Sequence, residues 1–177
     1  LSQVTDELGD RQKALSLAQQ AAARFPKHPG VLTHQGEMLG LSGNPFGAAA
    51  ALVAAEDAGG RDPDLLLIAA RHYRTAGMPE KAIETYERLR QRYSGSPQAF
   101  TAGIEQADQY YALGRASLAV DQLENLAKAF EGSPHLLPAL QTLSKIYRDF
   151  GLDDRVAGLA RQMVSLTTDP ETLADAA

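Results

Sequence analysis

Residues 62–97 read DPDLLLIAARHYRTAGMPEKAIETYERLRQRYSGSP, and this stretch decides the fold. Asp62-Pro63 predicts a helix start, because Asp accepts hydrogen bonds from the first amides of a helix and Pro fits its first position. Gly77 predicts the turn that ends this helix, since glycine tolerates a left-handed backbone. The residues that follow predict a second helix, which ends before the Ser-Pro pair that closes the stretch.

The proline and glycine positions of this stretch recur at intervals of 34 to 37 residues along the chain. The recurring residues are Pro29, Pro63, Pro97, Pro134 and Pro170, together with Gly9, Gly43, Gly77, Gly114 and Gly151. Such a period indicates stacked supersecondary units. The expected units are residues 1–28, 29–62, 63–96, 97–133 and 134–169, with the start of a further or capping helix at 170–177. The later periods are longer, so we expect a helix there to be extended by less than one turn.

Apolar residues within each unit follow the period of a helix. One stripe consists of Leu66, Ala69, Ala70 and Tyr73, and another of Ala82, Ile83, Tyr86 and Leu89. Spacings of three and four residues are typical of amphipathic helices, and no alternating strand pattern interrupts them. The predicted fold class is therefore all-α, with about ten helices in helix–turn–helix units.

This set of positions resembles the tetratricopeptide repeat family, whose units carry small residues near positions 8 and 20, glycine near 15 and aromatics near 11 and 24. With Gly77 set at position 15, those positions hold Ala70, Ala82, Tyr73 and Tyr86. The resemblance covers nearly the whole chain. It implies a right-handed α-solenoid of about five repeats, in which the small residues let the two helices of a unit cross closely.

Both ends of the chain interrupt the repeat pattern. The first unit is expected to keep only a short part of its first helix, Ser2–Leu8, before the turn at Gly9. At the other end, Leu173 and Ala174 are expected either to cap the last unit or to open a further one. We therefore expect residues 1–177 to form a single repeat domain that belongs to a longer protein and that self-associates through its exposed ends.

Composition narrows the function classes. The formal charge is −5 and the pI is near 5.3, which disfavours nucleic acid as a partner. Cysteine is absent, so disulfides, zinc–thiolate sites and cysteine nucleophiles are excluded. No apolar run approaches the roughly 18 residues that a membrane span needs. The compartment stays open between cytoplasm and bacterial periplasm.

The sequence carries no recognisable catalytic, metal-binding or cofactor-binding motif. The histidines are His28, His34, His72 and His135, and none has the spacing of a metal-binding motif. Glycine-rich phosphate loops and nucleophile elbows are also missing. We therefore predict a non-enzymatic protein without cofactors.

We interpret the acidic pairs and the arginine run of the sequence as structural features and not as functional sites. The acidic pairs Glu56-Asp57 and Asp153-Asp154 are expected at helix ends, where they would serve as caps or interact with the helix dipole. Arg88, Arg90 and Arg92 are expected on a solvated surface, because alternate residues do not share one helix face.

The resemblance implies that first helices line a concave groove through positions 5, 9 and 12 of each unit. The predicted partner-binding residues are Leu67, Arg71 and Arg74; Ile104, Asp108 and Tyr111; and Gln141, Lys145 and Arg148. The spacing i, i+4, i+7 places each trio on one helix face. An apolar centre with basic flanks favours an acidic peptide or helix of another protein. The alternative is a row of ordinary solvent-facing charges, with Asp108 pairing to Arg71 or Arg74.

The predicted function is a protein–protein interaction scaffold, and bacterial cell-envelope or polysaccharide-export assemblies are its expected setting by analogy. Chaperone-tail binding is disfavoured, because the lysine and asparagine that such repeats use at positions 5 and 9 are absent. Two alternatives stay open. One is an RNA-binding module that resembles pentatricopeptide proteins, and the other is a regulatory array attached to a catalytic domain elsewhere in a longer protein.

Overall fold

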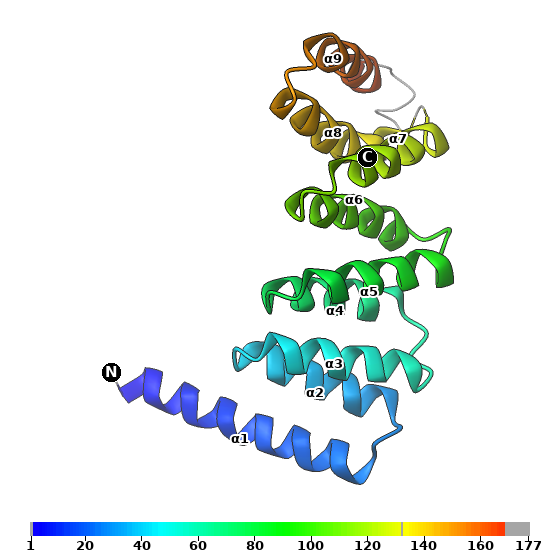
Figure 1. The fold of residues 1–177 in the computed structure, drawn as a ribbon. Coiled ribbons are helices and arrows are strands. Elements are labelled where there is room, and N and C mark those ends of the chain that lie inside the picture. The colour runs from blue at the N-terminus through cyan, green and yellow to red at the C-terminus, as the bar shows by residue number, and fades with distance from the viewer. Residues whose placement is uncertain (1, 132, 169–177) are drawn as a thin grey trace. The chain divides into compact units, whose positions relative to one another are not determined.

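The fold is all-α, as the sequence predicts. The computed structural model describes residues 2–131 and 133–168, and within these it contains nine α-helices, one 3-10 turn and no strand (Figure 1). The chain divides into two compact units, an N-terminal unit of residues 1–99 and a C-terminal unit of residues 100–177. One continuous repeat domain stays a prediction, and the expected cap at 170–177 lies outside the described residues.

The N-terminal unit consists of one long helix followed by two helical hairpins. Its helices are α1 (Ser2–Arg24), α2 (Pro29–Leu41), α3 (Pro45–Asp57), α4 (Pro63–Thr75) and α5 (Pro79–Arg92). Each helix packs against the next one along the chain. This order of neighbours is the one expected of stacked hairpins.

The C-terminal unit contains two further hairpins around one apolar core. Its elements are α6 (Pro97–Ala112), whose first three residues belong to the N-terminal unit, α7 (Ala116–Ala129), the 3-10 turn η1 (Pro134–Leu136), α8 (Leu137–Asp149) and α9 (Asp153–Thr168). The fully buried side chains at its centre include Leu123, Leu136, Leu140, Leu143 and Ile146. The predicted extension is confirmed, because α6 has 16 residues where α4 has 13.

The predicted helix starts are confirmed at Pro29, Pro63 and Pro97, each of which begins a helix. The Asp62 carboxylate accepts a hydrogen bond from the amide of Asp64 at 2.9 Å. The remaining predicted start within the described residues, at Pro134, opens a 3-10 turn that leads into α8.

The predicted glycine turns are confirmed in all four described hairpins. Gly43, Gly77, Gly114 and Gly151 have φ angles between 67° and 78°. This left-handed backbone is strained for residues with a Cβ, so glycine is what lets each first helix end and the second begin within a few residues.

The expected turn at Gly9 is wrong. Helix α1 runs without a break from Ser2 to Arg24, so the short helix Ser2–Leu8 does not exist as a separate element. A single glycine inside a helix costs only about 1 kcal/mol relative to alanine. No Pro-marked helix start follows Gly9, and the good helix formers Arg11, Gln12 and Lys13 continue the helix instead.

Small residues occupy the helix crossings, as expected. Ala70, Ala82, Ala107 and Ala119 are completely buried. In the first hairpin the residue equivalent to Ala70 is Gly36. A Cβ added to Gly36 would lie 2.8 Å from Cγ of Leu52 and 3.2 Å from the backbone oxygen of Ala48. The close approach of α2 and α3 therefore requires a residue without a side chain.

We expect the Gly36→Leu substitution to lower the free energy of unfolding by about 1–3 kcal/mol, because the new side chain overpacks this crossing. Chemical denaturation followed by circular dichroism measures the change. Gly158→Leu in α9 is the matched control, since a Cβ built there has no heavy atom of the described residues within 4 Å. Equal losses in the two variants would contradict the crossing geometry.

Candidate protein-interaction site

In the N-terminal unit, the predicted groove residues all lie on α4 but differ in exposure. Leu67 is buried at 6% exposure, whereas Arg71 is half-buried and Arg74 is exposed. Leu67 therefore belongs to the core and does not form an open apolar centre. The two arginines supply the polar part of this face.

In the C-terminal unit, α6 and α8 carry the remaining six predicted groove residues. Ile104 lies in the core at 9% exposure, while Asp108 and Tyr111 are half-buried. On α8 the side chains of Gln141, Lys145 and Arg148 are all exposed. The exposed part of this surface is thus polar and basic, with Tyr111 as its aromatic member.

A hydrogen bond fixes Tyr111 against α8. The Tyr111 hydroxyl donates to Oδ2 of Asp149 at 2.7 Å, which joins α6 to the last turn of α8. This bond raises the pKa of the Tyr111 phenol, so the hydroxyl stays neutral and remains a donor. Asp149 is itself exposed and lies next to the α8 strip, defined here as Gln141, Lys145 and Arg148, in which Lys145 and Arg148 are the exposed cations.

Glu56 and Asp57 lie at a helix end, as predicted, but their expected role as caps or dipole partners is wrong, because both residues pair with α5. The Glu56 side chain is completely buried, and Arg92 contacts its Oε1 at 2.9 Å. The Tyr93 hydroxyl donates to the same oxygen at 3.1 Å, and Arg88 pairs with both Glu56 and Asp57. At the C-terminal end of α3 the helix dipole disfavours acidic residues, so the arginines provide the compensation.

Arg88 and Arg92 lie at the surface, as predicted, but the sequence interpretation missed that both also form ion pairs with another helix. These residues are four apart and share one face of α5, while Arg90 pairs locally with Glu87 at 3.1 Å. The sequence does carry a signal for this contact. The acidic pair precedes Arg88 by about the length of one repeat, and stacked units bring equivalent helices together.

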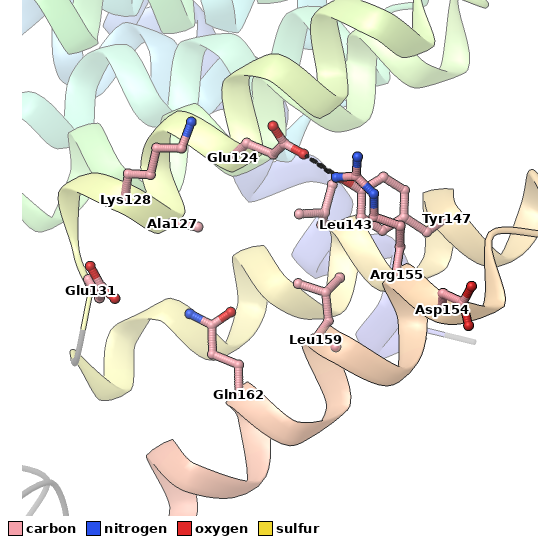
Figure 2. Close-up of a pocket in the computed structure, with 11 residues that line it drawn as sticks. Glu124, Ala127, Lys128, Glu131, Leu143, Tyr147, Asp154, Arg155, Leu159 and Gln162 are labelled. Carbon is pink, nitrogen blue, oxygen red and sulfur yellow. Dashed lines mark hydrogen bonds and ion pairs between the residues drawn. The ribbon is translucent and has the colours of Figure 1, made fainter.

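A groove that the sequence analysis did not anticipate lies between α7 and α9, with α8 at its base (Figure 2). It comprises two cavities of about 480 and 470 Å³. Both are lined by Glu124, Tyr147 and Arg155, which meet in the middle. The Tyr147 hydroxyl donates to Oε1 of Glu124 at 2.5 Å, and Arg155 approaches the same oxygen at 3.3 Å. Burial and the hydrogen bond to Glu124 both raise the pKa of Tyr147.

Gly158 forms part of the wall of this α7–α9 groove. A glycine inside a helix costs about 1 kcal/mol relative to alanine, and close packing usually explains it. Here a Cβ would meet no heavy atom of the described residues within 4 Å. The missing side chain therefore leaves the groove open instead of allowing a helix contact.

Among residues 2–131 and 133–168, no group of three or more acidic or histidine side chains is arranged to hold a metal ion. No helix in that described part combines the length and the apolar content required to cross a bilayer.

Comparisons with known proteins agree with the repeat geometry. The tetratricopeptide repeat family matches residues 64–96, whereas no curated protein matches the sequence. The crystal structure of MamA is 16% identical with a TM-score of 0.69, and the alignment covers 92% of this chain and 91% of MamA. A putative kinesin light chain from Podospora anserina with TPR-like repeats is 19% identical, with a TM-score of 0.66 and coverage of 94% and 92%.

A third solved structure, YrrB, is described as a TPR protein with an unusual peptide-binding site. It is 13% identical with a TM-score of 0.65, and the alignment covers 98% of this chain and 87% of YrrB. At these identities the likeness concerns the fold. The chain is a helical-hairpin repeat protein. Residues 64–96 match the tetratricopeptide repeat family, and the fold is similar to that of tetratricopeptide repeat proteins.

Proposed function

We propose that this protein is a non-enzymatic interaction scaffold whose first helices bind an acidic peptide or helix of another protein. The observation that carries the proposal is the α8 strip, where Lys145 and Arg148 are both exposed one helical turn apart. Tyr111 lies beside it, held by Asp149. Two cations and a fixed aromatic ring suit a ligand that combines carboxylates with apolar side chains.

The N-terminal unit offers a comparable face on α4, where Arg71 and Arg74 share one side of the helix. Leu67 and Ile104 support these faces from the core, and we include the half-buried Asp108 in the binding surface. The peptide-binding site named for YrrB supports binding as the kind of function that this fold performs. By analogy, we place the scaffold in a bacterial cell-envelope or polysaccharide-export assembly.

We expect the double charge reversal Lys145→Glu/Arg148→Glu to weaken binding of an acidic peptide by about tenfold or more, because like charges then face each other. Fluorescence anisotropy with a labelled peptide rich in glutamate and leucine measures the affinity. Raising the salt concentration should weaken wild-type binding and have less effect on the variant.

The single charge reversal Arg161→Glu is the control for this experiment. Arg161 is exposed on α9, and its Nε donates to the backbone oxygen of Ala157, so the substitution reverses a charge away from the α8 strip. The control should bind the peptide with nearly wild-type affinity. A similar loss in both proteins would mean that net charge, and not the strip, governs binding, and the proposal would then be wrong.

A further inference from the structure

The α7–α9 groove is separate from the α8 strip. Its residues on α8 are Leu143 and Tyr147, which point to a different side of the helix from Lys145 and Arg148. Its walls come from the second helices of the two hairpins (Figure 2). The groove is therefore a candidate binding surface independent of the α8 strip.

The base and ends of the groove are apolar. Ala127, Leu143 and Leu159 line one cavity, while Val120, Phe150 and Leu152 line the other. Phe150 is 56% exposed and Leu152 is 45% exposed, so large apolar side chains face solvent at one end. Contiguous exposed apolar surface inside a concave site is typical of a protein-binding surface.

The polar residues of the groove are predominantly acidic. Its carboxylates are Asp121, Glu124, Glu131 and Asp154, against the two cations Lys128 and Arg155. Arg155 is already paired with Glu124. The excess of negative charge favours an occupant with lysine or arginine beside its apolar residues.

The dimensions of the groove suit a short helix. Its lining on α7 extends from Ala116 to Lys128 within the helix, a rise of about 18 Å at 1.5 Å per residue, or about three to four turns. The ion pair between Arg155 and Glu124 lies at the middle of the groove. Because Arg155 is 65% exposed, this ion pair is weak in solvent and does not prevent a helix from lying in the groove. Tyr147, at 5% exposure, stays as the base.

We propose that the α7–α9 groove binds an amphipathic helix of a partner protein, with an apolar stripe flanked by basic residues. The stripe covers Ala127, Leu159 and Leu152, and the basic flanks face Asp121, Glu131 and Asp154. Gly158 keeps the wall low enough for the helix to enter. This is a helix-in-groove contact in which apolar anchors recur every three or four residues.

The test uses three labelled synthetic peptides of about 18 residues, long enough to span the groove. The first has leucines on one helical face and lysines beside them, the second has glutamates in place of the lysines, and the third is a scramble of the first. Fluorescence anisotropy with the full chain should give an affinity for the first peptide that is about tenfold or more above the other two. Equal binding of the first and third peptides would overturn the proposal.

Gly158→Phe provides the decisive variant, because its ring fills the groove from an open position and leaves packed contacts intact. It should weaken binding of the basic peptide by about tenfold or more. Ala157→Phe is the matched control, since Ala157 is an exposed neighbour outside the groove lining, and it should bind as wild type does. Unchanged binding by Gly158→Phe would contradict the site.

Two further measurements separate this proposal from others. The Lys145→Glu/Arg148→Glu variant should retain binding of the basic peptide, so a failed α8 strip and a failed groove give different results. Analytical ultracentrifugation of wild type and Gly158→Phe tests a second copy of the chain as the occupant. A wild-type dimer that Gly158→Phe dissociates would assign the groove to self-association and overturn the basic-helix proposal.

Discussion

Replacing Arg88 and Arg92 together with methionine is expected to lower the free energy of unfolding by about 3 kcal/mol. The reason lies in Glu56, whose side chain is completely buried between α3 and α5. With both guanidinium groups removed, the hydrogen bond from Tyr93 is the only one that the carboxylate keeps within the described part of the chain. A buried charge without a compensating cation costs far more than the pair itself contributes. Chemical denaturation of the full chain measures the loss.

Two controls decide whether the buried charge is the cause. Adding Glu56→Met to the double variant should recover most of the stability, because a fully apolar replacement of a buried ion cluster is often neutral. Arg90→Met should change stability by less than about 1 kcal/mol, since Arg90 and Glu87 form a partly exposed pair within one helix. A double variant as stable as wild type would show that Glu56 reaches water.

Tyr86→Ala is expected to lower the free energy of unfolding by about 3–5 kcal/mol. Tyr86 lies on α5 and is the largest fully buried side chain among the residues that the structure describes. Its removal loses the burial of an aromatic ring and leaves a cavity inside the repeat that matches the tetratricopeptide family. Thermal and chemical denaturation should both report the loss.

The matched variant Tyr86→Phe keeps the ring and removes only the hydroxyl. Its loss should be about 1 kcal/mol, the usual size of one hydrogen-bond contribution. A loss equal to that of Tyr86→Ala would show that the hydroxyl, and not the packing of the ring, stabilises this repeat.

Local chemistry explains why the hairpins could be predicted from sequence. Asp62 and Gly77 act within a few residues of themselves, through a side-chain cap and a left-handed turn, so their effect is readable without knowing the fold. Gly9 shows the limit of the same reasoning. Glycine ends a helix only where the following residues start another, and the residues after Gly9 do not.

Features that depend on distant residues were predicted less well. The helix period correctly placed Gln141, Lys145 and Arg148 on one exposed face of α8. The period cannot tell how much of Leu67 or Ile104 the neighbouring helices cover, and both are buried. The Glu56 cluster depends on helices about one repeat apart in sequence, and the α7–α9 groove on the separation of two helices. Local residue types do not determine how closely such helices, which are distant in sequence, approach each other.

Chemical-shift mapping can show whether the first helices bind the partner, because it reports where a ligand sits on the intact 18.9 kDa chain. The isotope-labelled protein is titrated with the acidic glutamate–leucine peptide. We expect the amide signals of Lys145, Arg148 and Tyr111 to shift progressively and saturate, while those of Arg161 and Gly158 stay in place. Saturating shifts elsewhere that leave α6 and α8 unchanged, or no shifts at all, would contradict a scaffold that binds its partner through its first helices.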